Sequence, residues 1–352
     1  MLKRWCFRLA CLALVLAGIG FAGSPVYGQT GEAPIRVAAT VPELGSLARE
    51  VGGDQVSVTV FAKGTEDAHF VEARPSFIRV LSQADLYIQA GMDLEIGWAP
   101  VLLQNARNSK VLPGAPGYLD ASVVIDPLEV PATPVDRSMG DVHPTGNPHY
   151  LLDPLNGLKV AQLIRDRLIQ IRPQRGHFFE ERYTDFRQRL GEALVGKALA
   201  HKYDVEKLAF LHQHGRLQRF LKDQREERLL RGWLGAMLPY YGTKAVGDHA
   251  LWPYFARTFG IRIIGHLEPL PGIPPTTRHL RAMVERMRAE SVPVVLAVVF
   301  YDSRHARFVA EQTGATVVTL AHQVGAREGT GDYLSMVDYN VRQLASALGG
   351  GR

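Results

Sequence analysis

The chain has 352 residues, of which 46% are hydrophobic and 21% charged, and its formal net charge is +5. This length predicts two domains with ample core volume. Lys3, Arg4 and Arg8 lie in a predicted export signal, and without them the charge falls to +2. So small a charge excludes a nucleic-acid partner recognised through a general excess of basic residues.

Residues 1–28 have the features of a cleaved export signal. A basic start precedes the apolar run from Leu9 to Phe21, and Val26-Tyr27-Gly28 supplies a cleavage pattern. The apolar run is too short to span a bilayer comfortably. Cys6 and Cys11 are the two cysteines of the chain, and both lie in this segment, so the mature protein has no thiol for metal binding, catalysis or a disulfide. We therefore expect a periplasmic protein.

The first part of the mature chain alternates short β-branched runs with helical stretches. This alternation predicts parallel βαβ packing. The expected strands are Ile35–Thr40, Gln55–Phe61 and Leu86–Gln89, and the expected helices are Pro42–Val51, Pro75–Gln83 and Glu95–Ala106.

The middle of the chain has a different character. A proline-rich loop at residues 126–148 carries His143, and long charged helical stretches follow at 155–171 and 176–200. A helix that is polar on most of its circumference often bridges two lobes. Residues 201–232 add another charged helical segment, which we expect to be a solvated insertion with Asp204 as an N-cap.

The βα pattern then resumes and continues to the C-terminus. It predicts an α/β fold of two βα sandwich lobes with parallel sheets, joined by a long linker helix. The expected domains are 29–172, a linker helix at 173–200, and 201–352 with the insertion at about 201–232. The expected strands are Lys244–Val246, Ile261–Gly265, Val294–Phe300 and Thr316–Leu320, and the expected helices are Leu251–Phe259, Thr276–Glu290, Ser303–Thr313 and Asp332–Leu348.

Four histidines follow strand patterns or the loops between them: His69, His149, His249 and His322. Open α/β sheets bind ligands at the carboxyl ends of their strands, and four neutral imidazoles suit Zn²⁺. A single histidine at a strand end is more often a loop or core residue with a hydrogen bond. Their joint placement is what indicates a metal site.

Other residues could orient these imidazoles or replace one of them as a ligand. His143, Glu268 and Asp302 are the candidates, because each falls in the proline-rich loop or after a strand. Of the four histidines, His322 is the one that a carboxylate could replace. Removal of His143 is expected to change zinc binding little.

Several sequence blocks occur together and in order. The blocks are Pro148-His149-Tyr150-Leu151-Leu152-Asp153-Pro154, Gly242-Thr243-Lys244-Ala245-Val246-Gly247-Asp248-His249, Trp252-Pro253-Tyr254-Phe255-Ala256, Pro271-Gly272-Ile273-Pro274-Pro275-Thr276 and Glu311-Gln312-Thr313-Gly314-Ala315. With these blocks, nearly all of the mature chain resembles the solute-binding proteins of the zinc/manganese class of ABC importers.

The resemblance implies two lobes tied by a rigid helix with a metal ion between them. It places His69, His149 and His249 at three histidine-ligand positions, and His322 where many members have an aspartate. It further implies that the chain is a monomer and not an enzyme, and that it binds Zn²⁺ as the transported ligand. The partner would be the transmembrane permease subunit with its cytoplasmic ATPase, met at the membrane surface. Mn²⁺ fits this set less well because it prefers oxygen ligands.

Three alternatives stay open at the level of sequence. A zinc hydrolase would need an open coordination position and a carboxylate base, for which Glu268 or Asp302 is available, although no HExxH pair is present. An adhesin or scaffold protein could keep the fold and use the metal structurally. A carrier of a chelated metal, or of Mn²⁺, Cu²⁺ or Ni²⁺, would use the same site.

Overall fold

The structure is a computed structural model that describes residues 32–135, 140, 142–270 and 272–350. The predicted signal at residues 1–28 lies outside the described residues. The chain divides into two units, Met1–Ala33 and Pro34–Arg352, and every described helix and strand belongs to the second. Within the described residues, no helix is both long enough and apolar enough to span a membrane.

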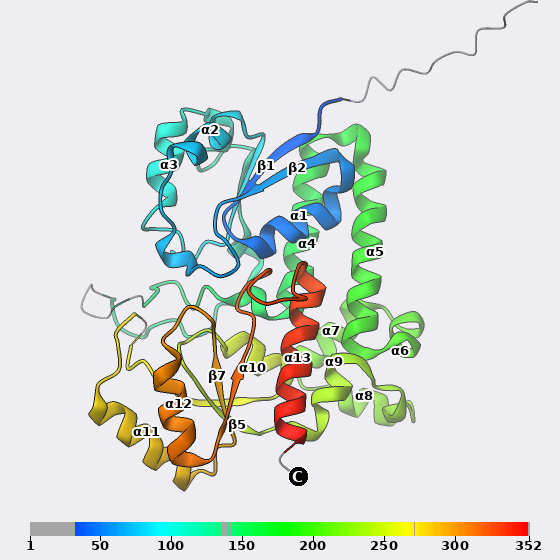
Figure 1. Ribbon diagram of the computed structural model, residues 1–352. Coiled ribbons are helices and arrows are strands. Elements are labelled where there is room, and N and C mark those ends of the chain that lie inside the picture. The colour runs from blue at the N-terminus through cyan, green and yellow to red at the C-terminus, as the bar shows by residue number, and fades with distance from the viewer. Residues whose placement is uncertain (1–31, 136–139, 141, 271, 351–352) are drawn as a thin grey trace, which may run out of the picture. The chain divides into compact units, whose positions relative to one another are not determined.

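The first sheet has four parallel strands in the order β2-β1-β3-β4. Three of these strands were predicted, whereas β4, of three residues, was not. A helix connects each strand to the next (Figure 1). The strands are β1 (Ile35–Ala39), β2 (Val56–Val60), β3 (Leu86–Gln89) and β4 (Tyr118–Asp120), and the helices are α1 (Pro42–Gly52), α2 (Pro75–Gln83) and α3 (Ala99–Ala106).

The second sheet repeats this arrangement with the order β6-β5-β7-β8, again all parallel. All four of its strands were predicted to within a few residues. The strands are β5 (Lys244–Gly247), β6 (Arg262–His266), β7 (Val294–Ala297) and β8 (Thr316–Thr319), and the helices are α10 (Pro253–Phe259), α11 (Thr277–Ala289), α12 (Ser303–Thr313) and α13 (Tyr333–Gly349).

Strand β1 shows why the strands of the two sheets have almost continuously hydrophobic sequences. Val37 and Ala39 pack into one buried cluster, while Ala38 between them packs into another. Successive strand residues point to opposite faces, and a parallel sheet is covered on both faces. Near-continuous apolar sequence is therefore what such a strand needs.

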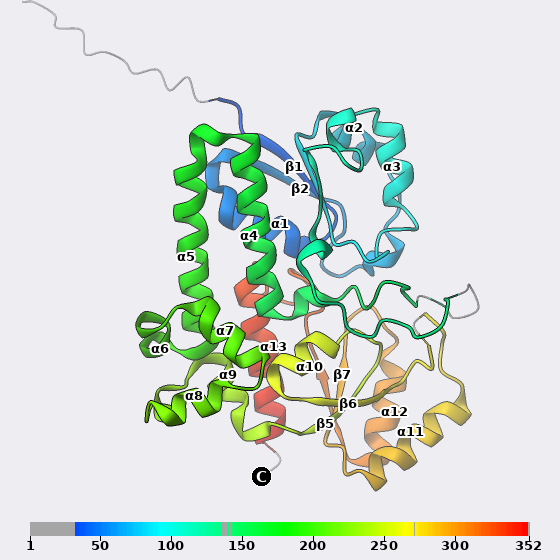
Figure 2. The same cartoon turned by 180° about the vertical axis from the view of Figure 1, so that it is seen from behind.

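Six α-helices of the described residues lie between the two sheets in the sequence. Figures 1 and 2 show α4 and α5 side by side, with α6 to α9 grouped near the far end of α5. These helices are α4 (Pro154–Ile171), α5 (Gly176–Val195), α6 (Lys197–Lys202), α7 (Val205–Gln213), α8 (Leu217–Asp223) and α9 (Gly232–Met237).

The predicted helix at 176–200 is interrupted at Gly196. This glycine has φ 89°, a value that L side chains rarely adopt, and it ends α5. A Cβ at this position would lie 2.6 Å from the Cβ of Arg231. Close approach of another segment therefore divides the helix.

The charged segment after α6 is less solvated than its composition predicted. Its apolar side chains at Leu208, Leu217 and Leu221 are buried and belong to the main core cluster. The charged side chains of α7 and α8 meet solvent, together with Phe210 of α7, which is 53% exposed. Asp204 is an N-cap as predicted, because its carboxylate accepts the backbone N–H of Lys207 at 2.9 Å.

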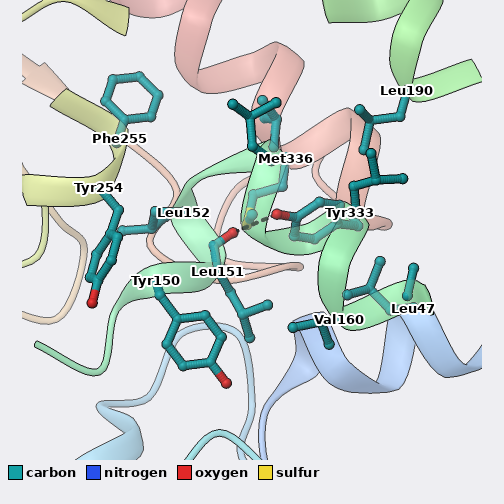
Figure 3. Packing of buried hydrophobic residues seen from close by; sticks show 14 of the residues in the cluster. Leu47, Tyr150, Leu151, Leu152, Val160, Leu190, Tyr254, Phe255, Tyr333 and Met336 are labelled. Carbon is teal, nitrogen blue, oxygen red and sulfur yellow. Dashed lines mark hydrogen bonds between the residues drawn. The ribbon is translucent and has the colours of Figure 1, made fainter. Parts of the chain in front are cut away.

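The main core fixes the chain immediately after His149. Figure 3 shows Tyr333, at the start of α13, beside Leu151. The Tyr333 hydroxyl donates to the carbonyl oxygens of Leu151 at 2.7 Å and Asp153 at 3.0 Å. Asp153 is the N-cap of α4 and accepts the N–H of Leu155 at 2.9 Å. The buried hydroxyl thus ties α13 to the segment that carries His149.

Candidate metal centre

Each of the four predicted histidines lies beyond the carboxyl end of a strand. His69 is in the short 3-10 helix Ala68–Phe70 after β2, and His249 follows β5. His149 precedes the 3-10 helix Tyr150–Leu152 in the connection after β4, and His322 follows β8. Parallel strands place all these ends on the corresponding edges of the two sheets.

Three of the four rings lie together. The ring centroids of His69 and His149 are 5.3 Å apart, those of His149 and His249 are 5.8 Å apart, and those of His69 and His249 are 6.1 Å apart. His143, from the proline-rich loop, joins them with its centroid 5.2 Å from that of His69. We call these four residues the imidazole cluster.

Two carboxylates orient imidazoles of the cluster. Asp67 Oδ1 lies 2.6 Å from Nδ1 of His69, and Glu268 Oε2 lies 2.7 Å from Nδ1 of His249. A carboxylate at Nδ1 fixes the proton there and leaves the lone pair on Nε2. Both rings would therefore offer Nε2 to a metal ion. The burial of Asp67 opposes its ionisation, but its hydrogen bonds and charge interaction with His69 outweigh that effect and lower its pKa.

The cluster favours neutral imidazoles. Burial, followed by the charges of His69 and His249, lowers the pKa of His143 to about 4. The same causes hold the pKa of His149 well below its ordinary value. Neutral imidazole is the form that binds a metal ion. These two side chains are therefore in the ligand form at neutral pH.

One distance in the cluster is close to that expected for two zinc ligands. Nε2 of His69 and Nε2 of His143 are 3.1 Å apart. Two imidazole nitrogens on one tetrahedral Zn²⁺, each about 2.0–2.1 Å from the metal, lie about 3.4 Å apart. Within the described part of the chain, however, no three His, Cys, Asp or Glu side chains already surround one point closely enough to hold an ion. Binding of an ion by these rings would therefore require them to move.

His322 has different surroundings. Its Nε2 lies 3.2 Å from the carbonyl oxygen of Glu66, and its ring packs edge-on against Phe300 at 4.6 Å. Burial lowers its pKa to about 4, and its charge acts on His149. The structure thus brings three of the four predicted ligands together and adds His143, while His322 lies to one side.

The predicted carboxylates also differ from each other. Glu268 contacts His249, as described above, whereas Asp302 is the N-cap of α12 and pairs with Arg304 at 2.5 Å. The side chain of Asp302 is 37% exposed. Asp67 was not among the predicted residues, although its position two residues before His69 was the available signal.

Asn147 holds the proline-rich loop in place next to the cluster. Its Oδ1 accepts the backbone N–H of His149 at 3.0 Å, and its Nδ2 donates to the carbonyl of Ala250 at 2.6 Å. The hydroxyl of Tyr254 in α10 donates to the carbonyl of Asn147 at 3.0 Å. These bonds join the loop before His149 to the segment after His249.

Two cavities border the cluster. One of about 610 Å³ is lined by His69, His143 and Trp98 among others. Another of about 410 Å³ is lined by Asp67, Glu268 and Asp302 among others. The carboxylates of the second cavity would attract a cation towards the imidazoles.

The two parallel α/β sheets bring imidazoles from both halves of the chain together in one candidate ligand-binding site. A family model described as "ZnuA: Zinc-uptake complex component A periplasmic" matches residues 37–224 and 234–347. The chain belongs to this family, whose members are substrate-binding proteins of ABC importers and not enzymes.

Known relatives extend over almost the whole chain. The metal ABC transporter substrate-binding lipoprotein ScbA of Streptococcus cristatus is 22% identical over 350 residues, which cover 97% of this chain and 98% of that protein. The manganese-binding lipoprotein MntA of Halalkalibacterium halodurans is 23% identical over 353 residues, 99% of each chain.

Solved structures share the fold. A crystal structure of ZnuA has a TM-score of 0.64 at 20% identity and covers 90% of this chain and 99% of its own. The Cd-bound periplasmic metal binding protein from Candidatus Liberibacter asiaticus has a TM-score of 0.63 at 16% identity, with 89% and 99% covered. The predicted fold class, two lobes with parallel sheets, is therefore confirmed.

Proposed function

We propose that this protein captures Zn²⁺ outside the cytoplasmic membrane and delivers it to an ABC permease. The observation that carries the proposal is the imidazole cluster, in which two Nε2 atoms already lie 3.1 Å apart. Membership in the family supports the transport role. The proposed partner is the transmembrane permease subunit with its cytoplasmic ATPase, met by a monomer at the membrane surface.

The chemistry of the cluster favours zinc over manganese. Four imidazole nitrogens form a set that Zn²⁺ accepts in a tetrahedron, whereas Mn²⁺ prefers carboxylate and carbonyl oxygens. Several relatives are named for manganese, MntA among them. We assign zinc here because the side chains that come together are imidazoles, while the nearby carboxylates of Asp67 and Glu268 are bound to ring Nδ1 atoms.

We assign the fourth ligand to His143 in place of His322. Nε2 of His143 faces Nε2 of His69, whereas Nε2 of His322 faces a carbonyl oxygen. The proposed ligands are therefore His69, His149 and His249 with His143. Four protein ligands leave no open position for a reactive water, as a carrier requires.

The two proposed lobes provide a way to release the bound ion. Residues 29–172 and 201–352 would form the two lobes, with the linker at 173–200. His69 and His143 lie on the first lobe, and His249 lies on the second. A shift of the lobes on docking to the permease would separate these ligands and weaken the bound ion. The relatives are lipoproteins by name, so anchoring by a lipid or release after signal cleavage are both compatible with this role.

The test is metal binding by residues 29–352 after removal of metal with a chelator. We expect one tightly held Zn²⁺ per chain and much weaker binding of Mn²⁺ in competition with a chromophoric chelator. His149→Ala abolishes tight binding, because it removes a central imidazole. His177→Ala is the matched control, since that side chain on α5 is 88% exposed.

Two further variants identify the fourth ligand. His143→Ala is expected to weaken zinc binding by about tenfold or more, while His322→Ala changes it less. The reverse order would return the fourth position to His322. Absence of stoichiometric zinc in the unaltered chain would refute the proposed function.

A further inference from the structure

Basic side chains recur at a regular interval in the charged segment after α7. An arginine or lysine stands at every third position from 216 to 228, namely Arg216, Arg219, Lys222, Arg225 and Arg228. Without the predicted export signal the chain has a formal charge of only +2, so the chain outside these five residues is acidic on balance. Positive charge gathered in one place indicates an anionic partner. We call residues 216–228 the basic segment.

Two buried leucines fix the direction of these charges. Leu217 and Leu221, one turn apart in α8, are buried in the main core cluster. Arg216, Arg219 and Lys222 therefore lie on the remaining side of the helix, and all three are exposed. In Figures 1 and 2, α8 lies at the edge of the molecule, on the side away from α11 and α12. The basic segment thus presents its charges to solvent.

The five basic side chains of the segment form no ion pair with any described carboxylate. The nearby Lys202, by contrast, pairs with Glu226. With Glu226 neutralised in this way, only Asp223 and Glu227 offset the five charges, which leaves an excess of three positive charges. Like charges held together without partners repel each other, and an anionic surface would relieve that repulsion.

An apolar cavity borders the basic segment. Its volume is about 190 Å³, and Leu217 of α8 lines it together with Leu238 and Tyr241, among others. Leu238 is 40% exposed and Tyr241 is 54% exposed, so the lining of the cavity reaches the surface. Accessible apolar surface and unpaired positive charge therefore occur side by side.

This combination favours anionic phospholipid over other anions. Inorganic phosphate or a soluble polyanion would neutralise the charges but leave the apolar side chains in water. An acidic protein surface would hold its carboxylates at fixed positions, whereas these basic side chains are long and no ion pair fixes their geometry. A membrane offers a diffuse layer of phosphate groups above an apolar layer, which suits both features.

We propose that the basic segment and the adjoining apolar cavity form a surface that binds membranes containing anionic phospholipid. Phosphate groups would contact Arg216, Arg219 and Lys222, while Leu238 would meet the apolar layer. The family model has no match at residues 225–233, so part of this surface lies outside the pattern that the family shares. The role is additional to metal capture and does not depend on which ion the imidazole cluster binds.

The test is flotation of residues 29–352 with lipid vesicles, since the apolar run of the export signal could itself insert. Vesicles of phosphatidylcholine alone are compared with vesicles of equal parts phosphatidylcholine and phosphatidylglycerol. We expect binding only to the anionic vesicles. It should weaken by about tenfold or more between about 0.01 M and about 0.15 M NaCl, because salt shortens the range of the attraction. Inorganic phosphate at constant ionic strength should not displace the protein.

A combined variant removes the charges of α8. It carries Arg216→Gln, Arg219→Gln and Lys222→Gln and should bind anionic vesicles about 100-fold more weakly, because each basic residue near an anionic membrane contributes about fivefold. Leu238→Gln should weaken binding by about threefold and leave its salt dependence unchanged. No loss in Leu238→Gln would overturn the part given to the apolar cavity.

The matched control removes the same charge from the other side of the molecule. It carries Arg278→Gln, Arg281→Gln and Arg307→Gln, at exposed positions of α11 and α12 that form no ion pair with a described residue. Its vesicle binding should stay within about twofold of that of the unaltered chain.

The proposal is overturned if the control loses as much binding as the α8 variant, or if the α8 variant binds as the unaltered chain does. It is equally overturned if the chain binds both kinds of vesicle alike or neither, or if inorganic phosphate displaces it. Zinc affinity should stay within about twofold in all variants, because every substitution lies outside the imidazole cluster. Absence of zinc binding with vesicle binding retained would count against the proposed function alone.

Discussion

The two sheets have the same strand order but hold their imidazoles in different ways. In the first, His69 follows the edge strand β2, and its carboxylate partner Asp67 lies two residues earlier. In the second, His249 follows the inner strand β5, and its partner Glu268 comes from beyond the neighbouring edge strand β6. One imidazole is oriented within a single turn, and the other by the pairing of two strands.

This difference determines which changes in the protein would disturb the orientation of each imidazole. Asp67 Oδ1 accepts both the backbone N–H of His69, at 3.0 Å, and its ring Nδ1. Glu268 Oε2 accepts from His249 and also from the backbone N–H of Gly272 at 3.1 Å. Orientation of His69 is therefore a local property, while orientation of His249 depends on the loop after β6. A common topology does not require a common construction of the site.

Among the carboxylates, Asp67 and Glu268 are expected to have the largest effects when they are removed. Asp67→Ala and Glu268→Ala should each lower zinc affinity by about 10–100-fold, because an imidazole without its partner loses its fixed orientation. The larger loss is expected for Glu268, whose side chain is 10% exposed against 21% for Asp67. Competition with a chromophoric chelator measures both.

Amide variants separate orientation from charge. Asp67→Asn and Glu268→Gln keep an oxygen that can accept the Nδ1–H, so they should lose less affinity than the alanine variants. Equal losses for amide and alanine would mean that the negative charge, and not the orientation, is what each carboxylate contributes. No loss for either alanine variant would contradict the role given to both.

A carboxyl group also follows the third strand of each sheet, and the two groups should differ in their effect on stability. Glu95, after β3, is buried and accepts from Thr40 Oγ1 at 2.6 Å and from the backbone N–H groups of Ala90 and Gly91. Burial is the main cause that raises its pKa to about 7, although these hydrogen bonds oppose it. In the folded protein Glu95 therefore holds its proton at pH values where the unfolded chain has lost it.

Because the pKa of Glu95 is higher in the folded protein than in the unfolded chain, the free energy of unfolding should fall as pH rises. The contribution of Glu95 to the free energy of unfolding is fully present below its ordinary pKa of 4.5 and is lost as pH rises through about 7. Between pH 5 and 8, the free energy of unfolding of the metal-free protein should fall, relative to that of Glu95→Gln, by on the order of a few kcal/mol. Urea unfolding at both pH values measures this, and parallel pH dependence of the two proteins would contradict it.

The smallest effect is expected at Asp302, after β7. This carboxylate is partly exposed and bound to Arg304, and it caps α12 by accepting the N–H of residue 304 at 2.9 Å. Asparagine caps helices about as well as aspartate, so Asp302→Asn should change the free energy of unfolding by less than about 0.5 kcal/mol. Zinc affinity should not change. A marked loss of affinity would make Asp302 a participant in the site.

The sequence predicted most of the fold because its signals are local. Helices α2 and α12 and strand β3 have the predicted bounds, since apolar periodicity and proline or N-cap residues define them within a few residues. Strand β4 was missed, because three residues carry too little pattern. The break at Gly196 was missed because the approach of Arg231, a distant residue, is what requires it.

The candidate site was predictable in part for the same reason. His69 and His249 each follow a strand that the sequence identifies, so their convergence could be inferred from parallel topology alone. The place of His149, after the missed strand β4, could be inferred only from the sequence block around it. The place of His143 could not, because a proline-rich loop has no periodicity to fix its path. Its path depends on contacts such as those of Asn147 with Ala250 and Tyr254.

The sequence by itself determined the class of fold, the sheet edges where ligands are expected, and three of the candidate imidazoles. It could do so because the patterns of strands and helices depend on neighbouring residues. The tertiary structure alone decided that His143 faces His69 while His322 faces the carbonyl oxygen of Glu66. The direction of a side chain at the end of a strand depends on what packs against it. For these residues, the neighbours come from distant parts of the chain.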